Sequence, residues 1–572
     1  MRKLALSDEI LLSVQQPARY IGGFNMAEKV PNEQMIRFAM CFPDVYEIGM
    51  SHLGMQILYA MFNKREDVYC ERVFSPWPDL DAILRKKHIP LFALESQEPV
   101  KAFDFLGFTI QYEMCYTNIL QVLDLSGIPL HAEDRKENDP IVIGGGPCAY
   151  NPEPLAPFFD MFYIGEGETQ YDNLFDLYKE IRKNGGNRWT FLEAAAKLPG
   201  IYVPMFYDVT YHEDGTIAEF KPNTPGIPAT IAKELVVDMD DAPYIENPIV
   251  PFIKVTQDRV VLEIQRGCIR GCRFCQAGNI YRPLREHSLE YLKNYARRML
   301  KNTGHEEISL SSLSSSDYTY LKELVTFLID EFHGKGVNIS LPSLRIDAFS
   351  LDVMSKVQDV KKSSLTFAPE AGSQRLRDVI NKGLTEEVIL KGASEAFHGG
   401  WNRVKLYFML GLPTETDEDV LGIADLARKV YFTWRECTPN KARGVRITVS
   451  TSWFVPKPHT AFQWEAQIPV EEYQRRVDLL RDALKRDKSI TYNWHDPQTS
   501  YLEAIFSRGD RRLADVLEWA WEHGAKFDAW SEYFDYQRWM DALSACGLDG
   551  DFYAHRVREK DELFPWAVPS VG

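Results

Sequence analysis

The chain has 572 residues, 45% of them hydrophobic and 26% charged, which is typical of a globular protein with about two to four domains. Its formal net charge of -17 argues against a surface that coats nucleic acid. We expect no membrane span because no uncharged apolar stretch reaches about 18 residues, and no secretory signal because acids interrupt the first residues. The nine cysteines are an odd number and thinly spread, which favours a reducing, cytoplasmic compartment over a disulfide framework.

Residues 1–190 are predicted to form an α/β domain. Apolar strands and helical stretches alternate over residues 35–42, 55–62, 105–111, 117–125, 140–143 and 158–164. Glycines follow the last two strands, at Gly144-Gly145-Gly146 and Gly165-Glu166-Gly167. This pattern predicts an open flavodoxin-like or Rossmann-like parallel sheet, whose ligands would lie at its carboxyl edge.

A connecting segment is expected over residues 191–250. It contains strands around His212-Glu213-Asp214-Gly215, which is a hairpin turn signal, and a stretch at 221–228 that has too many prolines for regular structure.

Residues 251–465 are predicted to form a partial (β/α)6 barrel of the TIM type. Six strands are expected, at 260–264, 307–310, 338–345, 364–367, 404–410 and 445–450. Helices are expected between them, near 289–300, 320–332, 351–357, 374–380 and 419–431. In a parallel barrel the chemistry lies at the carboxyl ends of the strands.

The remaining residues, 466–572, are predicted to form a small, mostly helical domain. Its many aromatic side chains, from Tyr492 to Trp539, are expected to form a core, and stacking on nucleobases is the alternative.

Three cysteines follow the first barrel strand in the stretch Gln265 to Gln276: Cys268, Cys272 and Cys275. Gly267 and Gly271 allow the chain to turn around a bound object, and Arg266, Arg270 and Arg273 are expected to favour thiolates. Clustered thiolates suit an iron–sulfur cluster or a zinc ion. Zinc is less favoured because no second Cys-x-x-Cys pair or His-x-x-x-His supplies further ligands.

The spacing Cys-x-x-x-Cys-x-aromatic-Cys, with Phe274 as the aromatic residue, resembles the signature of the radical S-adenosylmethionine (radical SAM) superfamily. The resemblance implies a [4Fe-4S] cluster on the three cysteines, with one iron open to chelate S-adenosylmethionine. It also implies a one-electron donor such as flavodoxin or ferredoxin, and reductive cleavage of the cofactor to a 5'-deoxyadenosyl radical that abstracts a hydrogen from a substrate.

The same resemblance suggests residues that contact the cofactor. The serines after the second strand stand where the superfamily often has Gly-Gly-Glu, and two cations are candidates for the carboxylate of the cofactor. Polar motifs after the fourth and fifth strands resemble those beside the ribose, the methionine and the adenine. The residues concerned are Phe274, Ser312, Ser314, Arg345, Glu370, Ser373, Lys405, Gly411 and Glu415. The alternatives are a helix N-cap for Ser373 and surface ion pairs for Arg345 and Glu370.

Residues 30–185 resemble the cobalamin-binding-like domain that precedes many radical SAM barrels. Gly144 and Gly145 would allow the nucleotide tail of cobalamin to approach the backbone, and the Asp-x-His-x-x-Gly motif that ligates cobalt is absent. Bound cobalamin would imply methyl transfer. A turn without any ligand is the alternative for these glycines.

Two further functions stay open at this point. Cys41, Cys115 and Cys148 follow strand ends, so a second cluster and sulfur insertion of the methylthiotransferase kind are possible alternatives, although buried cysteines without a ligand are favoured. A non-catalytic iron–sulfur electron carrier is the other alternative. The sequence does not decide whether the substrate is a small molecule, an RNA or a protein.

Overall fold

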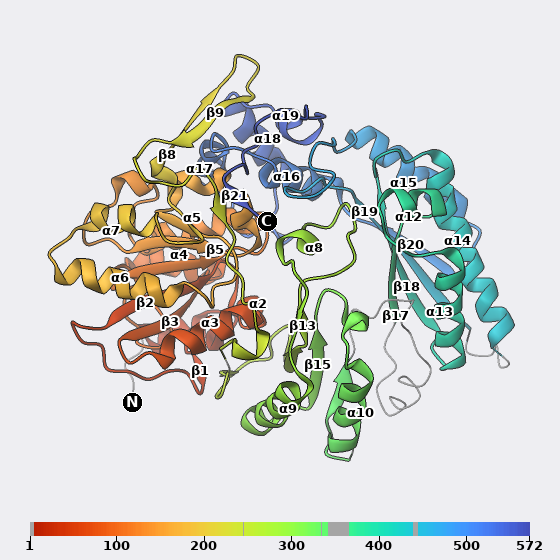
Figure 1. Cartoon of the computed structure of the whole chain (residues 1–572), viewed down its shortest axis with the longest axis horizontal. Coiled ribbons are helices and arrows are strands. Elements are labelled where there is room, and N and C mark those ends of the chain that lie inside the picture. The colour runs from red at the N-terminus through yellow and green to blue at the C-terminus, as the bar shows by residue number, and fades with distance from the viewer. Residues whose placement is uncertain (1–4, 244, 333, 341–364, 439–443) are drawn as a thin grey trace. The chain divides into compact units, whose positions relative to one another are not determined.

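The structure is a computed structural model in which residues 5–243, 245–332, 334–340, 365–438 and 444–572 are described (Figure 1). It divides into two compact units. The first contains Met1–Asp258, Phe506–Gly550 and Asp561–Gly572, and the second contains Arg259–Ile505 and Asp551–Lys560. The segment 466–572, which the sequence analysis placed in one separate domain, is therefore shared between the two units. The chain passes between them near α16 (Pro497–Ser507) and α19 (Gly550–Ala554).

The first unit is built on a six-stranded sheet with the order β3-β2-β4-β5-β6-β7. All neighbours are parallel except β7, which runs antiparallel to β6. The five parallel strands have the flavodoxin-like order 2-1-3-4-5 when they are renumbered along the chain, which confirms the predicted fold class. The strands are β2 (Ile36–Phe42), β3 (Val68–Phe74), β4 (Phe105–Thr109), β5 (Ile141–Gly145), β6 (Met161–Tyr163) and β7 (Ile201–Tyr202).

The sequence analysis did not identify β3, although all seven of its residues are buried. Glu71 and Arg72 interrupt its apolar pattern. In the fold both are paired: Glu71 with Arg37 of β2, and Arg72 with Glu95, whose carboxylate is 2.7 Å from the guanidinium. A buried strand can carry charges when partners on other segments satisfy them.

Helices of the first unit come from both ends of the chain. They are α1 (Asp8–Ser13), α2 (Tyr46–Gly49), α3 (Leu53–Lys64), α4 (Pro78–Lys87), α5 (Tyr116–Leu125), α6 (Tyr171–Lys183), α7 (Arg188–Ala195), α17 (Leu513–Glu522) and α18 (Tyr536–Ala545). Helix α17 packs against α5. Phe527 and Trp539 are almost completely buried, so the predicted core role of the C-terminal aromatic residues is confirmed for these two side chains.

Residues after α17 lie against the ends of β2 and β4, where the strand order of the sheet reverses. Asp44, which follows β2, accepts hydrogen bonds from Tyr112, which follows β4, and from Trp530 at 3.1 Å. The rings of Phe527 and Trp530 pack on Trp77 at centroid distances of 5.0 and 5.1 Å. Side chains of the protein itself therefore cover this part of the carboxyl edge.

The connecting segment completes the first unit. Its predicted hairpin is present as β8 (Tyr207–Tyr211) and β9 (Ile217–Pro222). Short pairings join β1 (Gly23–Phe24) to β11 (Val250–Pro251) and β10 (Ile231–Ala232) to β21 (Pro569–Ser570).

The second unit contains seven parallel strands among its described residues, arranged as β12-β15-β16 and β17-β18-β19-β20. They are β12 (Val260–Glu263), β15 (Glu307–Ser311), β16 (Asn338–Ser340), β17 (Leu365–Glu370), β18 (Arg403–Leu410), β19 (Arg446–Trp453) and β20 (Ile490–Trp494). The first six correspond to the expected strands. The seventh lies where the sequence analysis expected a helical tail, and it adds to the edge of the sheet beside β19.

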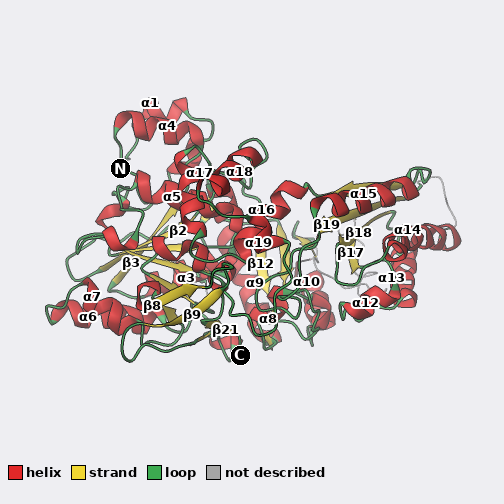
Figure 2. Cartoon of the chain, turned by 90° about the horizontal axis from the view of Figure 1, so that it is seen from above, coloured by secondary structure: helices red, strands yellow, loops and turns green. Residues whose placement is uncertain are grey.

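Helices separate these strands, as expected for a barrel of the TIM type (Figure 2). They are α8 (Gln276–Ile280), α9 (Leu289–Thr303), α10 (Leu321–Phe332), α12 (Gln374–Val379), α13 (Glu386–His398), α14 (Asp417–Cys437) and α15 (Val470–Leu484). Strand β18 alternates buried and partly exposed residues, and its buried side chains join those of α13, α14 and α15 in one core. The expected helix at 351–357 lies outside the described residues. Within the part of the chain that the structure describes, no helix is long and apolar enough to cross a membrane.

Candidate functional site

The three cysteines lie on a loop that is closed at its base by a short antiparallel ribbon. Strand β13 (Gln265–Arg266) pairs with β14 (Arg285–Glu286), and we call residues 267–284 between them the cysteine loop. Gly267 has a φ of +87°, and a Cβ atom there would lie 2.5 Å from the carbonyl oxygen of Pro283. Gly271 has a φ of +50°. The prediction that both glycines adopt left-handed conformations is therefore confirmed.

The thiols of the cysteine loop are half-buried and receive backbone hydrogen bonds. The amide of Arg270 donates to Sγ of Cys268 at 3.4 Å, and that of Gly278 donates to Sγ of Cys275 at 3.3 Å. Such bonds stabilise thiolates and tune the potential of an iron–sulfur cluster. Among the described residues, no group of three or more His, Cys, Asp or Glu side chains is placed to hold a single metal ion. A [4Fe-4S] cluster does not require such a group, because it binds each thiolate through a different iron.

The three arginines in and beside the cysteine loop form hydrogen bonds with oxygens of the protein. Arg266 bonds to Glu263 at 2.8 Å, Arg270 to Asp317 at 2.9 Å, and Arg273 to the carbonyl oxygen of Val379 at 2.6 Å. Burial raises the pKa of Cys275, while the amide of Gly278 and the charge of Lys382 lower it. The arginines therefore help to hold the loop in place, and their expected effect on the thiols stays a prediction.

The cysteine loop is fixed to the residues that end α12. The amide of Arg273 donates to the carbonyl oxygen of Ile380 at 3.0 Å, and the side-chain amide of Asn381 donates to that of Gly271 at 2.8 Å. Phe274 packs beside a small apolar core that includes Leu376, Ile380, Leu412, Phe454 and Phe462. Contacts with the protein itself therefore define the position of the loop.

Glu370 and Lys382 form an ion pair next to the cysteine loop. The ammonium of Lys382 lies 3.2 Å from Glu370 and 5.8 Å from the centre of the Phe274 ring. Burial raises the pKa of Glu370, and Lys382 counteracts that rise. The backbone of Glu370 has a φ of +69°, which is rare for a residue other than glycine and is typical of strained functional positions. The sequence analysis missed Lys382 because it lies beyond α12, outside every strand-end motif.

Two buried polar atoms beside the cysteine loop have no hydrogen-bond partner among the described residues: Oε1 of Gln265 and Oγ of Ser314. The amide nitrogen of Gln265 bonds to the carbonyl oxygen of Ser314 at 2.6 Å, so the two residues adjoin. A buried polar group without a partner is costly, and a ligand is one way to satisfy it. Ser312 is half-buried, and its hydroxyl lies 3.0 Å from that of Ser315. Gln265 was not among the predicted site residues, although its position directly before the cysteine loop could have indicated it.

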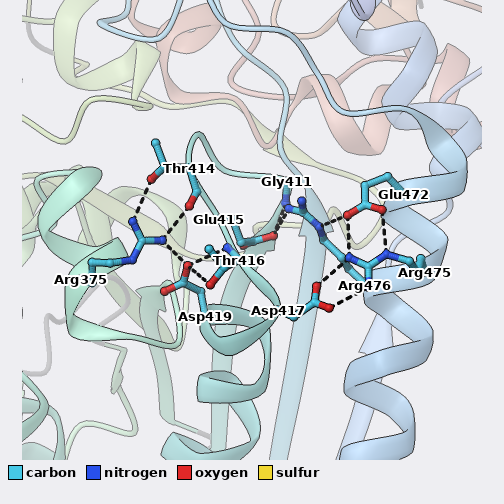
Figure 3. A network of polar contacts seen from close by, with 10 residues as sticks. All are labelled: Arg375, Gly411, Thr414, Glu415, Thr416, Asp417, Asp419, Glu472, Arg475 and Arg476. Atoms are coloured by element: carbon cyan, nitrogen blue, oxygen red, sulfur yellow. Dashed lines mark hydrogen bonds and ion pairs between the residues drawn. The ribbon is translucent and has the colours of Figure 1, made fainter.

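The other predicted residues at the ends of β17 and β18 have structural partners. Ser373 caps α12 by accepting from the amide of Leu376 at 3.1 Å, which is the alternative stated above for this residue. Gly411 has a φ of +89°, and a Cβ atom there would lie 2.8 Å from Ile468. The carboxylate of Glu415 accepts from the amide of Gly411 at 2.8 Å and from Arg476 at 2.6 Å (Figure 3).

Glu415 belongs to a network that joins the β18–α14 turn to α12 and α15 (Figure 3). Its side chain is 1% exposed, and burial raises its pKa to about 7 against the opposing effects of Gly411 and Arg476. Arg375 of α12 bonds to the carbonyl oxygen of Thr414 at 2.7 Å and pairs with Asp419. Direct contact between Glu415 and a cofactor stays a prediction, and the observed role of its carboxylate is to shape the turn.

Lys405 is not brought to this site. Lys405 is exposed near the amino end of β18, five residues and roughly 16 Å before the carboxyl end of the strand. Arg345 lies outside the described residues.

In the first unit, the two predicted glycines differ in their surroundings. A Cβ atom on Gly144 would lie 2.8 Å from the ring of Phe162, so packing in the sheet explains this glycine. A Cβ atom on Gly145 would have no neighbour closer than 3.8 Å, which leaves space at the end of β5. His52 caps α3 by accepting from the amide of Met55 at 3.1 Å, as expected for a polar residue at a helix start.

Comparisons with known proteins indicate the family of the chain. Residues 54–204 match a family model described as radical SAM proteins, N-terminal, and residues 262–427 match the model of the radical SAM superfamily. The chain is 30% identical over 495 residues to uncharacterized protein MJ0966 of Methanocaldococcus jannaschii, over 84% of this chain and 90% of that protein. It is 25% identical over 170 residues to putative methylthiotransferase MJ0865 of the same organism, over 28% of this chain and 37% of that protein.

Among solved structures, the chain resembles that of the radical S-adenosylmethionine methyltransferase TsrM from Kitasatospora setae, determined with cobalamin and a [4Fe-4S] cluster bound. The TM-score is 0.53 at 11% identity, over 90% of this chain and 100% of that chain. This similarity confirms the predicted α/β fold with a barrel of the TIM type.

Gly267→Ala tests whether the cysteine loop depends on its glycine. We expect the variant to retain less than about half of the iron that the wild-type protein binds after anaerobic reconstitution, because the added methyl group would meet the Pro283 carbonyl oxygen at 2.5 Å. Gly304→Ala is the matched control, since Gly304 also has a positive φ, +69°, but open space around it. Equal iron contents in the two variants would contradict the proposed role of Gly267.

Proposed function

Because the chain belongs to the radical SAM superfamily, we propose that Cys268, Cys272 and Cys275 hold a [4Fe-4S] cluster and that residues around the cysteine loop bind S-adenosylmethionine. Once bound and reduced by a donor such as flavodoxin or ferredoxin, the cluster and cofactor supply a 5'-deoxyadenosyl radical for modification of a substrate. The observation that carries this proposal is the cysteine loop itself, which is closed by β13 and β14 and fixed by hydrogen bonds to the end of α12.

The residues beside the loop match the methionine part of S-adenosylmethionine. That part carries an ammonium and a carboxylate, and the Glu370–Lys382 pair offers a group of opposite charge to each. Gln265 Oε1 can accept a hydrogen bond from the ammonium, and Ser314 Oγ can donate to an oxygen of the cofactor. These two atoms are buried without a partner, so a bound cofactor would satisfy them.

Rigid positioning and exclusion of water are the contributions that the protein makes to such chemistry. The strained backbone of Glu370 holds its carboxylate at the end of β17. The Glu415 network fixes the neighbouring turn after β18, whose Leu412 belongs to the apolar core beside Phe274. We infer that Glu370 and Lys382 touch the cofactor and that Glu415 positions the turn next to it.

Methyl transfer with cobalamin is our proposal for the reaction. The space beside Gly145 at the end of β5 would admit part of this large cofactor, whereas the ends of β2 and β4 are covered by residues 527–533. His52 is already engaged as a helix cap, so cobalamin would bind with its own base detached and without a protein imidazole on cobalt.

Sulfur insertion with a second cluster is the second candidate, and it has less support in this fold. Cys41 and Cys115 are almost completely buried, and burial raises the pKa of both thiols well above the usual value. The favoured interpretation of both residues remains buried cysteine without a ligand.

Cys272→Ala tests the main proposal. We expect it to abolish both the absorption of a four-iron cluster and the cleavage of S-adenosylmethionine under dithionite, because three thiolates share one site. Cys546→Ala, which removes a half-buried thiol of the first unit, should leave both unchanged. Full iron content and full cleavage in Cys272→Ala would refute the proposal.

Lys382→Met tests the cofactor contact. We expect it to weaken the binding of S-adenosylmethionine to the reconstituted protein by about tenfold or more in calorimetry, since a hydrogen bond to a charged group contributes roughly 1.5–3 kcal/mol. Iron content should be unchanged, because the anchoring bonds of the loop do not involve this side chain. Lys405→Met is the control and should bind S-adenosylmethionine with the affinity of the wild-type protein. Equal affinities in the two variants would show that Lys382 has a structural role only.

Gly145→Val tests the cobalamin proposal. The wild-type protein should take up cobalamin with a base-off visible spectrum, Gly145→Ala should take up less, and Gly145→Val should take up none, because valine fills the space at the end of β5. The strand itself should tolerate valine, a good strand former. Failure of the wild-type protein to retain cobalamin, together with iron lost on mutation of Cys115 and Cys148, would favour the second cluster.

A further inference from the structure

A cavity of about 240 Å³ lies in the first unit between α3 and the segment 245–249. Met50, Met55, Ala60 and Ile249 contribute apolar walls, and Arg72 of β3 lines the cavity from the sheet. The volume corresponds to roughly eight water-sized groups, which is enough for a small organic molecule. No function considered so far uses this cavity.

Arg72 is the unusual feature of this wall. Its side chain is only 1% exposed, and its Nε donates to Glu95 at 2.7 Å. Its terminal nitrogens contact thioether sulfurs, Nη1 that of Met50 at 3.2 Å and Nη2 that of Met26 at 3.9 Å, and its guanidinium also lies 6.0 and 5.7 Å from the centres of the Tyr46 and Tyr59 rings. Sulfur is a weak acceptor, so the hydrogen bonds of these two terminal nitrogens are weaker than bonds to oxygen would be.

Charged and polar residues also line the cavity. Lys64, at the end of α3, lies 4.0 Å from Glu246, and both side chains are exposed. Tyr59 also lines the cavity, and its hydroxyl is held by Glu95 at 2.9 Å and by the amide of Ala27 at 2.7 Å. A ligand in the cavity would therefore lie among apolar side chains and beside Arg72.

We propose that this cavity binds a small monocarboxylate with an apolar body, whose carboxylate accepts two hydrogen bonds from the terminal nitrogens of Arg72. A planar carboxylate matches the guanidinium edge in a bidentate manner, and it is a far stronger acceptor than the two thioethers it would displace. The apolar part of the ligand would lie against the methionines, which adapt to different shapes because their side chains are flexible.

This site is separate from the edge proposed for cobalamin. Arg72 lies on β3, at one end of the strand order β3-β2-β4-β5, and Gly145 lies on β5. A failure of the carboxylate site would consequently leave the radical SAM chemistry and the cobalamin proposal unaffected.

The test compares three probes of equal length, hexanoate, hexan-1-ol and hexylamine, by calorimetry with the full-length protein at neutral pH. We expect saturable binding of one hexanoate per chain and affinities at least tenfold weaker for the other two probes. Equal binding of hexan-1-ol would show that the cavity binds apolar molecules without the help of Arg72. Tighter binding of hexylamine would show that the charge of Glu95 dominates the cavity. Either result, or no binding of hexanoate, overturns the proposal.

Two variants locate the binding. Ala60→Phe fills the cavity without changing any charge and should abolish hexanoate binding, whereas Ala82→Phe, on the exposed face of α4, should leave it unchanged. The double substitution Arg72→Met with Glu95→Gln removes the ion pair without leaving a buried charge alone, and it should weaken hexanoate about tenfold or more. Wild-type affinity in Ala60→Phe would place the probe elsewhere and overturn the proposal, even if the double variant fails to fold.

Discussion

The site in the second unit depends on how firmly the cysteine loop is held before a metal binds. Three thiols on a free loop would pay the entropy of ordering the loop each time a cluster assembles. Here the β13–β14 ribbon closes the base of the loop, and hydrogen bonds from Arg273 and Asn381 join it to the end of α12. Much of that entropic cost is therefore met during folding, which is the general benefit of a preorganised site.

Two acidic residues at neighbouring strand ends have different roles because of their partners. Glu370 is paired with Lys382, whose ammonium also lies near Phe274 of the cysteine loop. Glu415 is held by Arg476 of α15 and by the amide of Gly411 within its own turn (Figure 3). The first pair has the opposite charges that a zwitterionic ligand requires, and the second is part of the framework that gives the turn its shape.

The first unit uses its own C-terminal residues to cover part of a sheet edge that in flavodoxin-like folds binds ligands. Asp44 accepts hydrogen bonds from Tyr112 and Trp530, and burial raises its pKa although these bonds counteract the rise. The residues after α17 therefore occupy the part of this edge at the ends of β2 and β4. The separate cavity is lined by Arg72 of the buried strand β3. The ion pair of Arg72 with Glu95 allows this charged residue to lie inside the sheet.

The sequence by itself determined the two parallel sheets and the position of the cysteine loop. Apolar periodicity identified the six expected barrel strands, and the spacing of Cys268, Cys272 and Cys275 identified the chemistry, because both are local properties of the chain. It also indicated the left-handed turns at Gly267 and Gly271, since glycine is the residue that such turns require.

Only the tertiary structure decided which polar residues come together. Lys382 meets Glu370 and Phe274 through the fold of α12, and Gln265 meets Ser314 across neighbouring strands, so no local pattern marks either pair. Strand β3 was missed because Glu71 and Arg72 are stable in a buried strand only with partners from other segments. Lys405 was chosen for its charge, although its place near the start of the expected strand already put it far from the carboxyl end. Pairing between distant residues is set by packing and electrostatics in three dimensions, and this is where the sequence pattern ceases to be informative.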